Sequence, residues 1–275
     1  MNKHQGKAAG FIKAFLWIYC SFIVFILGYI TYNSLRPKSQ ILSNTFGKPT
    51  GLSFDNYKKL IIDDKFFRYF GNSAIILIAS LVLLILLSSL TAYGIARYKF
   101  KMKKFVRIFF LIGLMFPVQL GIVPIFLIMS KLGLINNMAS VILISGTNVS
   151  MPVFMLSNFF AGLPKEMQEA AQIDGAGEWT IFQKIMMPLA KPVVMAVCIT
   201  VSVQIWNQFF IPLIFIQSDK LKTIPLLVTK YTNNLMSSIN LALAISVLST
   251  IPILIIFIFF SNKIIDGVMA GAVKG

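Results

Sequence analysis

The sequence predicts an all-α integral membrane protein with six transmembrane helices. The chain of 275 residues is 57% hydrophobic and only 12% charged, whereas soluble domains carry roughly 25% charged residues. Long uncharged stretches recur along the chain, and each is long enough for a membrane span, which needs about 20 mostly apolar residues. Lys and Arg gather between these stretches, as is typical of the ends of membrane spans.

The first predicted span covers residues 14–31. Lys3, Lys7 and Lys13 precede it, so a secretory signal peptide is the alternative interpretation. The apolar run is longer than the roughly 7–15 residues of a signal-peptide core, and no small-x-small cleavage site follows it. We therefore expect a retained first helix, with residues 1–13 as a cytoplasmic N-terminal segment.

A polar segment, residues 32–70, follows and is expected outside the cytoplasm. It mixes basic residues with aspartates, and residues 54–57 are predicted to form a short ordered element. The second span is predicted at 72–96. The next segment, 97–107, has six Lys or Arg among eleven residues, and this density places it in the cytoplasm by the positive-inside rule.

Four further spans are predicted from the remaining apolar runs. In the third, Pro117 and Pro124 are expected to bend the helix. Residues 217–240, between the last two spans, are polar with an apolar middle, and they are interpreted as a loop, with a short re-entrant hairpin as the alternative. These spans cover residues 106–129, 138–160, 192–216 and 241–262. The transmembrane domain thus extends over 14–262.

The topology of six spans places both termini on the cytoplasmic side. Residues 263–275 then form a cytoplasmic tail, which is expected to fray because its residues are small and flexible. Residues 163–192 also lie in the cytoplasm, between the fourth and fifth spans. This polar segment contains four of the nine acidic residues of the chain, namely Glu166, Glu169, Asp174 and Glu178.

The local pattern within 163–192 predicts a helix, a glycine turn and a second helix. Residues 165–173 are good helix formers, and Gly175 can adopt the left-handed conformation that ends a helix. The second helix is predicted at 178–187, where Pro188 and Pro192 end it or bend it into the next span.

Small and apolar residues give this segment two kinds of surface. A plain connecting loop is one interpretation, but the ordered turn and the small residues favour a docking surface. The small residues are Ala170, Ala171, Gly175, Ala176 and Gly177. The apolar residues expected to anchor the segment are Met167, Ile173, Trp179, Phe182 and Ile185.

The spacing of these residues resembles the EAA loop of permeases from ABC importers. The resemblance covers Glu169-Ala170-Ala171, Asp174-Gly175-Ala176, Phe182 and the Pro188–Pro192 segment. It implies the type I importer permease fold and a loop that inserts into a cleft of a cytoplasmic ATPase. It further implies that Glu169 makes the polar contact, that Ala170, Ala171, Gly175 and Ala176 allow a close fit, and that Asp174 caps the turn.

The end of the chain resembles the maltose-type, MalG-like sugar permeases. In that branch the C-terminal tail contacts the ATPase dimer, which would here involve Gly271, Ala272, Val273, Lys274 and Gly275. Further similarities to this branch are Asn136, Trp206-Asn207 and Thr223-Ile224-Pro225.

The family resemblance implies a set of partners for a non-catalytic membrane subunit. These are a second, related permease (a heterodimer), two ATPase subunits that bind ATP and Mg²⁺, and an extracytoplasmic solute-binding protein. The chain itself has no GxxxxGK[ST] phosphate-binding loop. Hydrolysis of ATP is therefore expected on the partner, with no cofactor on this chain.

The charge distribution argues against several other classes of function. The net charge of +16 is explained by Lys and Arg at the ends of spans, and no nucleic-acid-binding motif is present. No acidic residue falls within a predicted span and the only histidine is His4, whereas proton-coupled carriers keep ionisable groups in the membrane. Cys20 and Cys198 are interpreted as packing residues, and no metal site is expected. A sodium-coupled carrier or a sensor remains the alternative.

Polar residues in the middle of the predicted spans are all uncharged. They can form hydrogen bonds between helices, or line a path for a polar, uncharged solute such as a sugar. The candidate path residues are Asn148, Gln204, Trp206 and Asn207. A charged amino acid, peptide or phosphodiester is a less favoured substrate because it would need an intramembrane charge. The other polar residues of this kind are Gln119, Ser145, Thr147, Ser150, Asn158 and Gln208.

Overall fold

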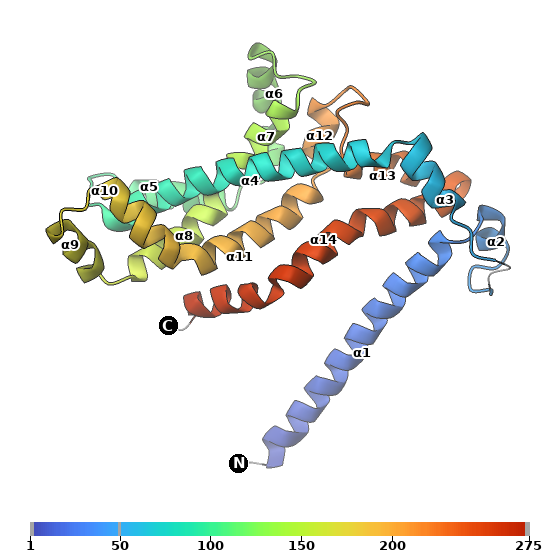
Figure 1. Ribbon diagram of the computed structural model, residues 1–275, viewed down its shortest axis with the longest axis horizontal. Coiled ribbons are helices and arrows are strands. Elements are labelled where there is room, and N and C mark those ends of the chain that lie inside the picture. Colours follow the sequence, from blue (N-terminus) through green and yellow to red (C-terminus); the bar gives the residue numbers. More distant parts are fainter. Residues whose placement is uncertain (1–2, 49–50, 273–275) are drawn as a thin grey trace. The chain divides into compact units, whose positions relative to one another are not determined.

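The computed structural model describes the backbone of residues 3–48 and 51–272, and the side chains of residues 10, 12–48 and 51–259. Every regular element among these residues is a helix (Figure 1). In chain order they are α1 (Lys3–Ser34), α2 (Lys38–Ser43), α3 (Asp55–Lys58), the π-helix η1 (Lys59–Asp63), α4 (Phe66–Arg97), α5 (Lys103–Gly113), the 3₁₀ helix η2 (Val118–Gly121), α6 (Ile122–Lys131), α7 (Met138–Gly146), α8 (Ser150–Gly162), α9 (Glu166–Ile173), α10 (Glu178–Ile181), the π-helix η3 (Phe182–Met186), α11 (Met187–Trp206), α12 (Phe210–Phe215), α13 (Ile224–Thr232) and α14 (Leu235–Ala272).

Five of the described helical stretches are long and apolar enough to cross a membrane. A sixth is obtained if α5 and the η2–α6 pair are one span, bent by 97° at the break between them. These five stretches are Ile12–Ser34, Phe66–Arg97, Met138–Gly162, Glu178–Trp206 and Leu235–Phe259. This number agrees with the six spans predicted from the sequence.

The chain divides into two compact units. One contains the described residues up to Phe67 together with Leu227–Ile251, and the other contains Arg68–Leu226 together with the described residues from Pro252. The first unit includes most of the predicted extracytoplasmic segment. The second includes the 163–192 hairpin and most of the spans.

The first unit is ordered around a buried arginine. Arg36 is only 1% exposed. Its guanidinium donates to the Asn33 side chain at 2.8 Å and to the backbone carbonyls of Asn44 at 2.9 Å and Gln40 at 3.1 Å. The Asn56 amide donates to the carbonyl of Arg36 at 3.1 Å. The polar segment 32–70 is therefore a folded lobe, and the predicted element at 54–57 corresponds to α3.

The same unit contains an acidic group, Asp64, whose side chain is only 9% exposed. Asp64 accepts hydrogen bonds from the ammonium of Lys230 and the phenol of Tyr231.

Residues 217–240 were expected to be a loop, but α13 and the start of α14 lie within them. The apolar middle of this segment, Ile224–Leu227, is buried, which explains why it forms a helix.

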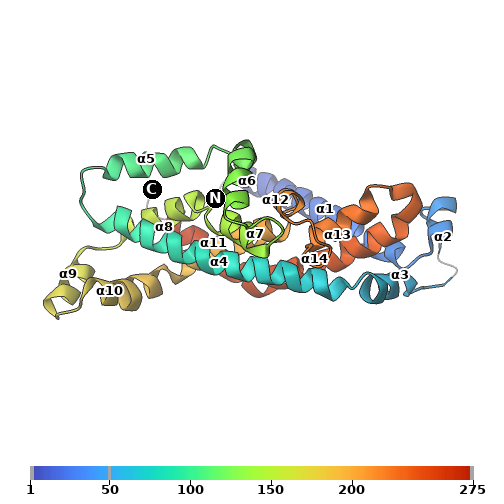
Figure 2. The ribbon, with the colours of Figure 1, turned by 90° about the horizontal axis from the view of Figure 1, so that it is seen from above.

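In the second unit, α8 packs against both α5 and α11 (Figure 2). The predicted fourth span is two helices, α7 and α8, separated by a short break at residues 147–149. Pro117 breaks the third span as expected, because its ψ of 139° is extended. Pro124 does not bend the chain, since it lies in the first turn of α6, where a missing N–H costs little.

The fifth span differs most from its predicted bounds of 192–216. A continuous helix runs from Glu178 to Trp206, and α12 is separate. Pro188 and Pro192 were expected to end or bend the second hairpin helix, but both lie within the helix, and the π-helical turn η3 ends two residues before Pro188. A π turn shifts the backbone hydrogen bonds by one residue, so the helix continues past a residue that cannot donate one.

Candidate functional site

The 163–192 hairpin has the predicted helix–turn–helix form. Gly175 has φ = +79°, the left-handed conformation expected at the end of α9. The Gly175 N–H donates to the Gln172 carbonyl at 3.0 Å and the Ala176 N–H donates to the Ala171 carbonyl at 2.9 Å. These two bonds satisfy carbonyls that the last turn of a helix otherwise leaves unpaired.

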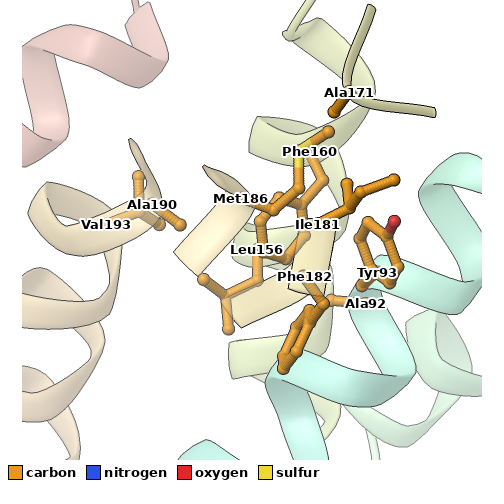
Figure 3. Close-up of a cluster of buried hydrophobic side chains, with 10 residues drawn as sticks. All are labelled: Ala92, Tyr93, Leu156, Phe160, Ala171, Ile181, Phe182, Met186, Ala190 and Val193. Atoms are coloured by element: carbon orange, nitrogen blue, oxygen red, sulfur yellow. The ribbon is translucent and has the colours of Figure 1, made fainter. Parts of the chain in front are cut away.

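A buried apolar cluster fixes the hairpin to the membrane helices (Figure 3). Phe182 and Met186 of η3 are 6% and 0% exposed, and Phe160 of α8 is 0% exposed. The ring of Tyr93, on α4, lies 5.2 Å from that of Phe182 and 5.9 Å from that of Phe160. The other members are Ala92, Leu156, Ala171, Ile181, Ala190 and Val193.

The predicted ATPase-coupling residues divide between this cluster and the outer face of the hairpin. Ala171 is 8% exposed and packs inward. Ala176 is half-buried against the cluster. Glu169, Ala170, Asp174 and Gly175 are exposed.

The anchoring residues expected from the sequence are divided too. Phe182 and Ile185 pack in or against the cluster, as predicted. Ile173 points outward, with 87% exposed, and the expectation that it anchors the hairpin was wrong because it lies on the face of α9 opposite to Ala171. Trp179 is 57% exposed, but its ring lies 5.5 Å from that of Phe182. Met167 is similarly exposed at 38%.

A carboxylate joins the hairpin to the end of α4, and the sequence did not indicate it. Glu178 accepts hydrogen bonds from the Tyr98 phenol at 2.6 Å, the Gln172 amide at 2.9 Å and the Tyr93 phenol at 3.2 Å. The hydrogen bond to Glu178, with a smaller effect of burial, raises the pKa of Tyr98 above its ordinary value. Tyr98 therefore remains a donor at neutral pH.

A cavity of about 260 Å³ lies between α9 and the ends of α4 and α8. Glu169 and Gln172 of α9 line it together with Arg97 and Lys165. The Arg97 guanidinium donates to the Pro164 carbonyl at 3.4 Å. The predicted polar contact residue, Glu169, thus lies beside positive charges of its own chain.

A second cavity, of about 370 Å³, lies at the breaks between α5 and η2 and between α7 and α8. We call it the polar cavity. Two of the four predicted path residues, Asn148 and Gln204, line it. Apolar lining comes from Leu84, Ile144 and Val201, among others. The remaining polar residues of its lining are Gln119, Ser145, Ser150 and Gln208.

The other two predicted path residues do not line this cavity. Trp206 is 4% exposed, and its ring packs at 5.6 Å against that of Phe70. Asn207 is the C-cap of α11, and its amide donates to the Val203 carbonyl at 3.0 Å. Trp206 is the last residue of α11 and Asn207 is the residue after it, and these positions favour packing and capping.

Two further predicted features have structural positions. Asn136, with φ = +58°, accepts hydrogen bonds from the backbone N–H of Gln217 and of Ser218 at 3.1 and 2.7 Å. In the predicted tail, Gly271 and Ala272 lie in the last turn of α14, whereas Val273, Lys274 and Gly275 fall outside the described residues. In the described part of the chain, no group of His, Cys, Asp or Glu is arranged to hold a metal ion.

Comparison with known proteins decides the family. Residues 84–271 match the family described as binding-protein-dependent transport system inner membrane component. The chain belongs to this family. It is a non-catalytic permease subunit of an ABC importer and a multi-pass protein of the cell membrane, as the resemblance of the EAA loop predicted.

Individual relatives match over nearly their whole length. The permease is 36% identical to the arabinooligosaccharides transport system permease protein of Halalkalibacterium halodurans, over 98% of this chain and 99% of that one. It is 30% identical to a diacetylchitobiose uptake system permease protein of Streptomyces coelicolor, over 98% and 90%.

A solved structure confirms the fold. The permease resembles a chain from the crystal structure of a bacterial ABC transporter involved in the import of the acidic polysaccharide alginate, with a TM-score of 0.81 and 20% identity. The match covers 95% of this chain and 98% of that one.

Proposed function

We propose that this permease forms part of the translocation pathway of an ATP-driven importer for a sugar or oligosaccharide. The observation that supports the substrate class is the polar cavity, whose polar side chains are all uncharged. Neutral amides and hydroxyls can donate to and accept from sugar hydroxyls. Transport of sugars by the relatives named above is consistent with this substrate.

The outer face of the 163–192 hairpin is the proposed contact with the ATPase. Ile173 and Met167 leave apolar surface exposed on a helix whose other outward residues, apart from Ala170, are polar. Exposed apolar groups rimmed by polar ones are typical of protein interfaces. The exposed side carries Glu169, Ala170, Asp174 and Gly175. Ala171 and Ala176 face the buried cluster instead.

The assembly we propose contains a second permease, two ATPase subunits that bind ATP and Mg²⁺, and an extracytoplasmic solute-binding protein. Residues 1–13, 163–192 and 263–275 lie on the cytoplasmic side, and residues 32–70 lie outside. The tail residues 271–275 contact the ATPase dimer. Closure of the dimer by ATP moves the hairpin, and the spans then reorient to expose the polar cavity alternately to each side.

Reconstitution tests this function. The permease, its second permease and the ATPase subunits are placed in proteoliposomes, and radiolabelled oligosaccharide is supplied with the binding protein. We expect uptake that requires ATP inside and the binding protein outside. Uptake without any nucleotide-hydrolysing subunit would instead support the self-contained carrier. Binding-protein-dependent uptake of another solute, with no uptake of sugars, would contradict the sugar assignment and leave the importer assignment intact.

A further inference from the structure

The Glu178 carboxylate lies where three segments of the permease meet. Tyr93 and Tyr98 reach it from α4 and the residue after it, and Gln172 reaches it from α9. Glu178 itself is the first residue of the helix that continues through η3 into α11. The negative side chain is also favourable at a helix N-terminus.

These hydrogen bonds differ in kind from the other contacts beneath the hairpin. The buried cluster there is apolar apart from the Tyr93 phenol, and apolar contacts are non-directional, so helices packed in this way can slide. Hydrogen bonds to a carboxylate are directional and stronger than neutral ones. Glu178 therefore fixes the register of α9 relative to α4.

The two helices joined at this point both extend to the polar cavity. Leu84, which lines that cavity, lies on α4 and precedes Tyr93 along this helix. Gln204, which also lines it, lies on the helix that begins at Glu178. A displacement of the hairpin can thus reach the cavity along two continuous helices, provided that they move together.

From this arrangement we propose that Glu178, held by Tyr98, Tyr93 and Gln172, is a positioning residue that makes α4 and α11 follow the hairpin as one body. Its role is to convert ATPase movement into reorientation of the pathway. The inference rests on the proposed function. It requires that the hairpin is moved by the ATPase, but it does not depend on which solute is carried.

The test separates transport from hydrolysis in the reconstituted importer. Solute carried per ATP hydrolysed is measured for the original protein, Y98F, E178Q and the double variant, with Y19F as a matched control because Tyr19 is exposed on α1. We expect the ratio to fall about tenfold in Y98F, the effect that loss of one hydrogen bond to a charged group allows. Copurification of the ATPase and its rate of hydrolysis should stay within about twofold of the original.

The double variant tests whether the two residues act as a pair. Tyr98 and Glu178 share one hydrogen bond, which either substitution already removes. The ratio in the double variant should therefore fall no further than in the single variant with the larger loss. Multiplied losses would overturn the proposal, as would an unchanged ratio in Y98F, or equal losses of hydrolysis and transport. An importer of the original protein that showed no ATP-dependent uptake would refute the proposed function itself, so the two failures are distinguishable.

Discussion

Gly146 lies against Leu83 with no room for a side chain. A β-carbon on Gly146 would be 2.8 Å from the Leu83 Cδ2 and 3.1 Å from its β-carbon. The contact joins the end of α7 to the middle of α4. Gly146 is one position from Ser145 and two from Asn148, which both line the polar cavity. It therefore holds the break between α7 and α8 close to α4.

The first prediction concerns this contact. G146A should destabilise the permease by about 1–3 kcal/mol, because the Leu83 β-carbon cannot rotate away and overpacking must shift the backbone. Thermal unfolding in detergent measures the effect. G94A is the control, since nothing lies within 4 Å of a β-carbon there, and alanine is the better helix former. A midpoint for G146A equal to that of G94A would contradict the close contact.

The turn of the 163–192 hairpin gives the second prediction. G175A should weaken copurification of the ATPase, because a non-glycine residue in the left-handed conformation costs roughly 1–2 kcal/mol. Insertion into the membrane should be unaffected. G177A is the matched control two residues away, with φ = −70° and open space around its β-carbon. Equal copurification of the two variants would mean that the turn does not position the docking face.

The third prediction separates the four candidate path residues. N148A and Q204A remove amides from the polar cavity and should lower the maximal rate of sugar uptake about tenfold, as expected for lost hydrogen bonds to a solute. N207A removes a helix cap instead and should reduce stability with little effect on uptake per folded importer. Normal uptake by both cavity variants would exclude them from the path.

Hydropathy and turn chemistry sufficed to predict much of this fold. The spans follow from uncharged runs, and the conformation of Gly175 follows from its place after Asp174, because few residues tolerate φ near +79°. The direction in which Ala171 and Ile173 point could not be predicted. Both are apolar and two positions apart, and only the position of Phe160 and Tyr93 decides which one is buried.

Contacts between segments far apart in the chain could also not be predicted from the sequence. Tyr98 and Glu178 are 80 positions apart, and neither belongs to a motif that would link them. Asn148 and Gln204 were recognised as polar residues in apolar runs, but so were Trp206 and Asn207. The two pairs differ because Trp206 packs against Phe70 and Asn207 caps α11, and the apolar sequence that continues into α12 hides the end of this helix.

The last prediction concerns the lobe around Arg36. R36A would remove the guanidinium that donates to the Asn33 side chain and to the carbonyls of Gln40 and Asn44, although both carbonyls keep a backbone donor. A hydrogen bond to a charged group contributes about 1.5–3 kcal/mol, so residues 38–58 should become open to proteolysis from outside the membrane. K48A is the control, because it removes an equal charge from an exposed site of the same lobe. Cleavage of R36A at the rate of K48A would show that the guanidinium does not hold this lobe together, and cleavage from the cytoplasmic side alone would reverse the proposed topology.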